Sequence, residues 1–185
     1  THYPAQFMAA VISNQGGFYS TFAYVSEARR MGVEILPPDV NKSNICWKGR
    51  AGGMRVGLLS IKYLSTNTRR RIVTKRKAKP YHDIIDFLER VQPDNNEVRS
   101  LIHAGAFDSL YTGESRASLL WELACRQKSR SKRSGAGDLF SGRTDVPKPS
   151  FPPENKTERL RHEFSALGFL CDRHPMVLYA DTLKK

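Results

Sequence analysis

The stretch from Met54 to Leu110 constrains the fold more than any other part of the chain, because residues that start and end helices alternate there at short intervals. An apolar run over 56–61 passes through a polar turn at 65–68 into a basic segment, which ends at Lys79-Pro80. An amphipathic segment, a Pro-Asp-Asn-Asn break and a further short segment then lead to Gly105. Proline and glycine at such points end helices. The stretch therefore predicts two successive helix–turn–helix units.

Positive charge is concentrated in the first of these units. The chain has 30 Lys+Arg and 18 Asp+Glu, a formal net charge of +12. A balance of this kind favours a polyanionic partner, through electrostatic steering and the release of counterions. A basic face that only improves solubility is the alternative, but the clustering favours nucleic acid. No acidic residue interrupts the cluster, which consists of Arg69, Arg70, Arg71, Lys75, Arg76, Lys77 and Lys79.

The turn before the basic segment is predicted to present backbone N–H groups to a phosphate. Thr66 or Asn67 is expected to cap the helix, which leaves the N–H groups of its first turn pointing outward. Arginines at 69–71 oppose the helix dipole by a few tenths of a kcal/mol each, and a bound anion would offset this. About five neutralised phosphates predict a slope near −4 to −5 for log K against log salt. The predicted DNA-binding residues are Lys62, Ser65, Thr66, Asn67, Arg69, Arg70, Arg71, Lys75, Arg76 and Lys77.

The part before residue 56 is predicted to support this surface. Apolar residues at helical spacing predict a helix over Pro4–Asn14, and a second helix, capped by Ser20 or Thr21, is expected to end at Gly32. Consecutive prolines at 37 and 38 force an extended path over 33–41. Two strand-like runs, 44–48 and 54–59, flank a glycine-rich loop and predict a β-hairpin.

Several residue types that can form catalytic or metal sites are interpreted as structural. Asp39 and Asn41 could serve an active site, but such residues more often stabilise a turn. Cys46, Cys125 and Cys171 are far apart and odd in number, which indicates reduced thiols rather than a disulfide framework. No pair of cysteines has metal-ligand spacing, the glycine-rich loop lacks the P-loop pattern, and no apolar run approaches a membrane span.

The second unit is predicted to contain helices over 82–91 and 97–104, the latter capped by Asn95 or Asn96. His103 is interpreted as a surface or capping residue rather than a metal ligand. A further helix is expected from Ser115 to about Arg126, where an apolar stripe ends.

The composition after residue 127 changes to that of a linker, with alternating basic and serine residues. An isolated apolar pair, Leu139-Phe140, follows Asp138. This pair either packs back on the domain or forms a short linear motif for a pocket of a partner. Residues 147–153 predict a rigid spacer, and helices are expected over 158–168 and near 177–185.

Six segments in order resemble the alpha subunit of bacterial DNA polymerase III, the C-family replicative polymerase. They span nearly the whole chain in the order of the family, which argues against a chance match. The segments are YPAQFMAA (Tyr3–Ala10), EARRMGVEILPPDVN (Glu27–Asn41), GLLSIK (Gly57–Lys62), LIHAGAFDSL (Leu101–Leu110), GDLF (Gly137–Phe140) and EFSALGFLCDRHPM (Glu163–Met176).

The resemblance implies a mainly α fold, in which a helical fingers segment with a small β-hairpin precedes tandem helix-hairpin-helix motifs and a flexible tail. Residues 1–56 would be the distal fingers segment, and 57–126 the tandem helix-hairpin-helix region that binds primer–template duplex DNA. Residues 127–157 would be a linker with a motif for the sliding clamp (beta subunit), formed by Asp138, Leu139 and Phe140. Residues 158–185 would form a helical lead-in to an OB-fold domain.

The resemblance also implies a parent enzyme, a DNA-directed DNA polymerase or nucleotidyltransferase. Its catalytic aspartates lie in the palm, upstream of this region, and the chain reads as a piece of a longer protein. The fragment is therefore expected to have no catalytic residue, metal site or cofactor of its own, whereas the parent would use Mg²⁺. The implied setting is the bacterial cytoplasm at the nucleoid, with other polymerase III holoenzyme subunits as partners and no membrane.

Two departures from the family pattern affect these expectations. Tyr63 and Ser65 stand where family hairpins carry glycines, which shifts the expected DNA binding to the arginines at 69–71. Ala136 stands where the clamp motif usually begins with glutamine, and this fits an error-prone paralogue, as does the run 17–20. The alternative function is a protein-interaction module of such a paralogue, with the basic surface only solubilising. No constellation favours a free-standing hydrolase.

Overall fold

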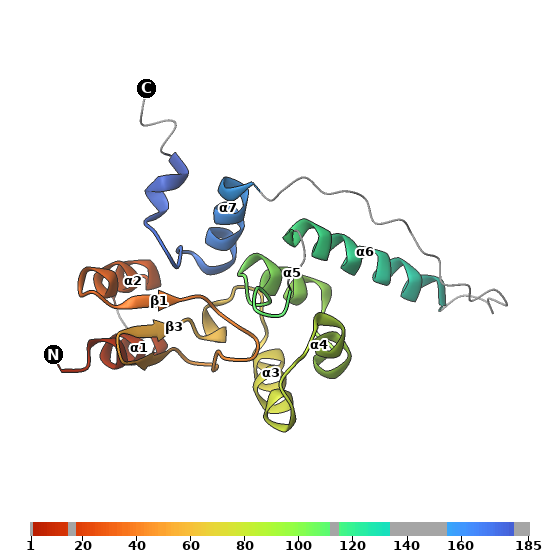
Figure 1. The fold of residues 1–185 in the computed structure, drawn as a ribbon, viewed down its shortest axis with the longest axis horizontal. Coiled ribbons are helices and arrows are strands. Elements are labelled where there is room, and N and C mark those ends of the chain that lie inside the picture. Colours follow the sequence, from red (N-terminus) through yellow and green to blue (C-terminus); the bar gives the residue numbers. More distant parts are fainter. Residues whose placement is uncertain (1, 15–17, 112–114, 134–154, 180–185) are drawn as a thin grey trace. The chain divides into compact units, whose positions relative to one another are not determined.

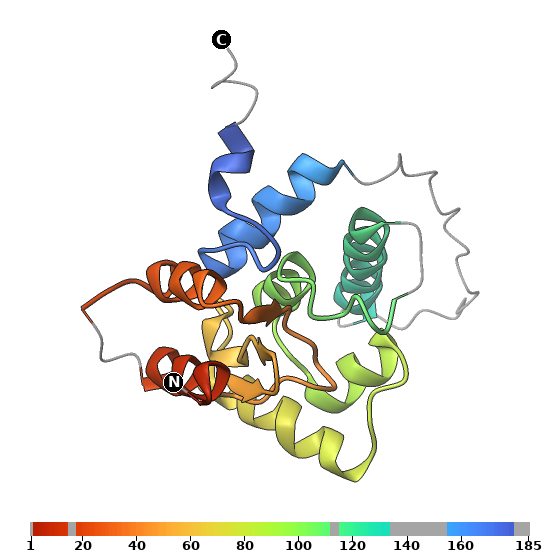
Figure 2. The same ribbon diagram turned by 60° about the vertical axis from the view of Figure 1, so that its left-hand side comes forward.

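The computed structural model describes residues 2–14, 18–111, 115–133 and 155–179 (Figures 1 and 2). The chain divides into two compact units, residues 1–112 together with 156–185, and residues 113–155. The first unit combines helices with one small sheet, and the second contains a single described helix, so the fold is mainly α as predicted. The first unit thus joins the predicted fingers segment, most of the predicted DNA-binding region and the C-terminal segment.

A three-stranded sheet lies near the start of the first unit. It consists of β1 (Glu34–Leu36), β2 (Lys48–Arg50) and β3 (Gly53–Arg55) in the order β1-β3-β2. β2 and β3 form an antiparallel hairpin, which confirms the predicted hairpin. The strands are shorter than predicted and lie closer to the turn, because Gly49, Arg50 and Gly53, predicted as loop residues, belong to them. β1 pairs parallel to β3, with Ile35 opposite Met54. The sequence predicts only an extended path for β1, because its partner is distant in the chain.

Two helices pack beside this sheet and beside each other (Figures 1 and 2). α1 (Pro4–Asn14) buries an apolar face that includes Met8 and Ile12, and α2 (Thr21–Arg30) is capped by the Ser20 side chain. Gly49 permits the close approach of α1 to β2. A Cβ atom at this position would lie 2.4 Å from the backbone carbonyl of Ala5.

A buried turn connects the sheet to the following helices. Asp39 Oδ1 accepts hydrogen bonds from the backbone N–H groups of Asn41 and Lys42, at 2.8 and 3.0 Å. The Asn41 side chain pairs with the backbone of Tyr81, donating to its carbonyl at 2.7 Å and accepting from its N–H at 2.8 Å. Both residues are therefore turn residues, as predicted. Asn41 joins the segment after β1 to the start of the second helix–turn–helix unit.

The two predicted helix–turn–helix units form the helical layer of the first compact unit. A short 3₁₀ helix, η1 (Leu58–Ser60), precedes α3 (Thr66–Ala78), α4 (Ile84–Val91) and α5 (Asn95–His103). The first helix of the first predicted helix–turn–helix unit is therefore only a 3₁₀ turn. The core between these helices is aromatic, because the Phe87 ring contacts those of Tyr81 and Phe107 edge-on, each at 4.9 Å between centroids.

The C-terminal segment returns to the same unit. α7 (Lys156–Leu167) packs on α5, and the 3₁₀ helix η2 (Pro175–Tyr179) follows it. The Lys62 N–H donates to the Ala166 carbonyl at 2.9 Å, and the Arg29 guanidinium donates to the carbonyls of Leu170 and Arg173. This segment therefore contacts both the hairpin before α3 and the second N-terminal helix.

The second unit contains α6 (Arg116–Arg133). The sequence predicts an end near residue 126, where the apolar stripe stops, but the helix continues to Arg133. Lysine, arginine and glutamine are good helix formers, so α6 can extend beyond its apolar stripe.

Candidate nucleic-acid interface

The N-cap of α3 is Ser65, one residue before the first of its two predicted caps. Ser65 has extended backbone angles, and its side chain accepts a hydrogen bond from the Thr68 N–H at 3.2 Å. Thr66 and Asn67, the predicted caps, instead lie exposed in the first turn. Tyr63, in the hairpin before the cap, has a φ of 60°, a left-handed conformation that glycine adopts readily and other residues rarely.

The N-cap of α5, Asp94, also lies one residue before the first of its two predicted caps. The Asp94 side chain accepts from the N–H groups of Asn96 and Glu97, and the Glu97 carboxylate accepts from the Asp94 N–H at 2.9 Å. This is a capping box, which satisfies unpaired donors at both its ends. Asn95 and Asn96, the predicted caps, lie inside the helix.

Glu97 also connects α5 to the start of α3. Its carboxylate accepts a hydrogen bond from the Ser65 N–H at 3.0 Å and another from the Thr68 hydroxyl at 2.9 Å. Glu97 is only 3% exposed to solvent. Burial opposes ionisation, but the hydrogen bonds from Ser65, Asp94 and Thr68 dominate and lower the pKa of Glu97. One buried carboxylate therefore fixes the first turns of two helices relative to each other.

The basic residues of α3 divide into an inner and an outer set. Arg69 and Arg76 lie two turns apart on the inner side and are partly buried. Arg76 donates to the Val40 carbonyl at 2.9 Å, and to Asn44 Oδ1 at 3.1 Å. Arg69 lies with its Nη2 3.5 Å from the Ile61 carbonyl. Burial lowers the pKa of both arginines.

The outer set consists of residues that remain exposed. Arg70 and Lys77 are also two turns apart, on the face of α3 that points away from the protein, and Lys75 is exposed nearby. Arg71 is half-buried, and its Nη2 donates to the Thr68 hydroxyl at 3.0 Å. Lys62 is exposed just before Tyr63. Arg69 and Arg76 turn toward the protein itself, whereas the other predicted DNA-binding residues stay exposed or half-buried along α3 and the hairpin before it: Lys62, Ser65, Thr66, Asn67, Arg70, Arg71, Lys75 and Lys77.

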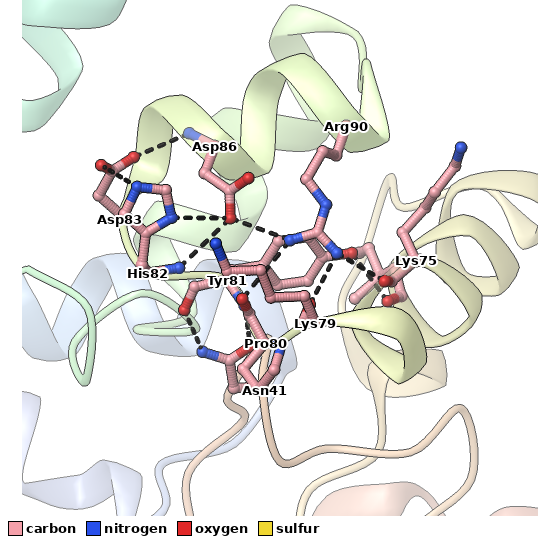
Figure 3. A network of polar contacts seen from close by, with 10 residues as sticks. Asn41, Lys75, Lys79, Pro80, Tyr81, His82, Asp83, Asp86 and Arg90 are labelled. Atoms are coloured by element: carbon pink, nitrogen blue, oxygen red, sulfur yellow. Dashed lines mark hydrogen bonds and ion pairs between the residues drawn. The ribbon is translucent and has the colours of Figure 1, made fainter.

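Arg90 of α4 holds the other end of α3 (Figure 3). Its Nη2 donates to the carbonyls of Lys75 and Lys79, at 2.5 and 2.7 Å. Its Nη1 lies 2.9 Å from Asp86 Oδ2, and its guanidinium carbon lies 4.6 Å from the centre of the Tyr81 ring. These contacts satisfy carbonyls that the end of a helix leaves without partners. This role of Arg90 could not be predicted, since one arginine in an amphipathic helix gives no sequence signal of it.

Family comparison identifies the motif that these helices form. Residues 32–119 match a model described as a helix-hairpin-helix motif. The DNA polymerase III subunit alpha of Thermus aquaticus is 32% identical over 191 residues, which cover 96% of this chain and 15% of that protein. The error-prone DNA polymerase of Corynebacterium efficiens is 33% identical over 178 residues, covering 96% of this chain and 16% of that protein.

The DNA polymerase III subunit alpha of Halalkalibacterium halodurans is 30% identical over 197 residues, covering all of this chain and 17% of that protein. The chain belongs, as a segment, to the DNA polymerase III alpha subunit family. It spans less than a fifth of the length of these relatives. The recognition made from the six sequence segments is therefore confirmed.

Some residues predicted for this alpha-subunit segment lie outside the part that the structure describes. Asp138, Leu139 and Phe140, the predicted clamp motif, are among them, and the motif stays a prediction. Within the described ranges, no three His, Cys, Asp or Glu side chains are grouped so that they could hold a metal ion. No helix in those ranges combines the length and apolar character needed to cross a membrane.

Proposed function

We propose that this segment binds the phosphate backbone of primer–template duplex DNA within a DNA polymerase. The proposal is carried by the outer cations of α3, Arg70, Lys75 and Lys77, together with Lys62 of the preceding hairpin. None of these four forms an ion pair with a residue that the structure describes. They are therefore available to an external anion, and the helix-hairpin-helix motif supports DNA as that anion.

Arg70 is the most informative of these cations. Lys75 and Lys77 lie in the last turn of α3, where a positive charge is favourable to the helix dipole without any ligand. Arg70 lies near the N-terminal end, where a positive charge is unfavourable. A phosphate at this end would be attracted both by Arg70 and by the N–H groups of the first turn, beside Thr66 and Asn67. Phosphate binding would thus offset the unfavourable interaction of Arg70 with the helix dipole.

Salt dependence of binding tests the proposal. Four phosphate contacts predict a slope of about −3.6 for log K against log salt, since each contributes about 0.9. This is shallower than the value predicted from sequence, because Arg69 and Arg76 are turned inward. Fluorescence anisotropy on a labelled primed duplex measures the slope. A flat response, or no binding at about 50 mM salt, would end the proposal. Glu at both Arg70 and Lys77 should weaken binding to all sequences alike, because phosphate contacts carry no base information.

We further propose that Asp138, Leu139 and Phe140 tether the parent polymerase to the sliding clamp. An apolar pair in a polar tract supports this proposal. Alanine at Leu139 and Phe140 should abolish clamp binding in a pull-down and leave DNA binding intact, whereas retained clamp binding would contradict the motif. Clamp binding without any DNA binding would favour the alternative, a protein-interaction module with a solubilising basic face. The DNA-directed DNA polymerase activity of the parent, its Mg²⁺ and its holoenzyme partners are part of the same proposal.

A further inference from the structure

A pocket with a volume of about 570 Å³ lies beside the first hairpin. Its walls come from three segments, with Tyr63 from the hairpin, Asn96, Arg99 and His103 from α5, and Ser165 from α7. All three segments belong to the first compact unit. The volume falls within the roughly 300–1,000 Å³ typical of small-molecule sites. Because the residues that line the pocket are far apart in the sequence, no sequence motif predicts it.

Tyr63 is held in this place at an energetic disadvantage. Its φ of 60° is a conformation in which side chains other than glycine are strained. Gln92, which also has a positive φ, is explained by its position as the C-cap of α4, where its N–H donates to the Leu88 carbonyl. Tyr63 is 79% exposed, so packing within the protein cannot offset its strain. Strained residues of this kind gather at ligand sites.

The chemistry of the pocket matches a nucleotide. The exposed Tyr63 ring can stack on a nucleobase. Arg99 is exposed on α5 and can pair with a phosphate, and Asn96 and Ser165 can hydrogen-bond to base or sugar. The acidic wall residue, Asp94, already accepts two backbone N–H groups through its Oδ1. A purely apolar ligand would find less complementarity.

The neighbourhood of the pocket places it on the path of a bound strand. Tyr63 directly follows Lys62 and lies two residues before Ser65, so the pocket opens at the hairpin that leads into the outer face of α3. Another residue of the pocket wall, His103, has its ring stacked parallel on that of His162 with 4.3 Å between centroids. A strand held by the α3 cations would pass the pocket entrance.

We propose that this pocket takes one unpaired nucleotide of the bound DNA, with its base stacked on Tyr63 and its phosphate paired with Arg99. This inference rests on the proposed DNA binding and specifies which form of DNA is preferred. The preferred ligand is a duplex with an adjoining single-stranded nucleotide, rather than a continuous duplex. Glycine at position 63 would leave the pocket without its stacking surface.

The test uses the 185-residue chain and two DNA probes of equal duplex length. One is blunt, and the other carries a template overhang with 2-aminopurine at its first unpaired position. The wild type should bind the overhang probe more tightly and change the 2-aminopurine fluorescence. Tyr63→Ala should weaken overhang binding by about 5- to 150-fold, the range for loss of one stacked base, and leave blunt-duplex affinity unchanged. Tyr63→Phe should keep the preference.

Two further variants separate a ligand role from a structural one. Tyr63→Gly should lose the overhang preference while its thermal midpoint stays equal or rises, since glycine relieves the positive φ. Tyr19→Ala, on a tyrosine that is 71% exposed but outside the pocket, should have no effect. Equal loss on both probes in Tyr63→Ala, or no overhang preference in the wild type, would overturn the inference and leave duplex binding standing. Failure to bind either probe would refute both.

Discussion

Neighbouring arginines of α3 offer a sharp test of which side chains meet DNA. Arg70 points outward, whereas Arg69 is partly buried with its Nη2 3.5 Å from the Ile61 carbonyl. The perturbation is Arg70→Gln, compared with Arg69→Gln, which removes the same charge one position earlier. A double variant, Arg70→Gln with Lys77→Gln, removes both cations of the outward face.

The magnitude follows from the number of exposed cations. With four contacts the wild-type slope is about −3.6, and affinity should fall about 150-fold between 50 and 200 mM salt. Arg70→Gln should reduce the slope to about −2.7, because one contact contributes about 0.9. The double variant should have a slope of about −1.8 and lose only about 12-fold over the same range. Arg69→Gln should keep the wild-type slope.

The assay is fluorescence anisotropy of a labelled primed duplex at several salt concentrations. A urea unfolding curve for each variant verifies that the fold is intact. Arg30→Gln, on an exposed arginine of α2, serves as a control for net charge alone. If Arg69→Gln or Arg30→Gln flattened the slope as much as Arg70→Gln, overall charge would explain the binding. The assignment of the outer face of α3 would then be refuted.

Three other predictions concern the frame that holds this face. Arg90→Ala should lower the free energy of unfolding by about 1–3 kcal/mol, since it removes the donor to two carbonyls at the end of α3 and one of the partners of Asp86, which keeps His82; Arg90→Lys should recover only part in urea titrations, and full recovery would contradict the two-carbonyl geometry. Glu97→Gln should cost about 1–3 kcal/mol. Because the folded-state pKa of Glu97 is lowered from 4.5, the carboxylate's contribution is present above that pH and lost as pH falls below it, so the difference between the wild type and the variant should shrink in acid; a constant difference would count against it. Gly49→Ala should cost about 1–3 kcal/mol through the clash with Ala5, and an unchanged thermal midpoint would show that α1 can move away freely.

Proline and glycine residues near helix ends made most helices predictable from the sequence. Pro4 and Gly32 mark the start of α1 and the region just after α2, and the break at Lys79-Pro80 separates α3 from α4. The hairpin of β2 and β3 followed from its glycine-rich loop. The pairing of β1 with β3 did not, because it depends on contacts between residues far apart in the chain.

Cap positions and the orientation of α3 were beyond sequence reasoning for a different reason. Several polar residues in a row, at 65–68 and 94–96, can each cap a helix, and the choice depends on where Glu97 lies in space. α3 has few apolar residues, chiefly Ile72 and Val73, so its buried face was undetermined. The basic cluster was therefore found as a group, but its inner and outer arginines were not separated.

The shared carboxylate at position 97 has a consequence for reading mutational scans of this segment. Any substitution at position 97 disturbs the first turns of α3 and α5 at once, although Glu97 is almost wholly buried. A functional screen would score position 97 as severely as a direct contact with ligand, and only a separate measure of folding would tell the two apart.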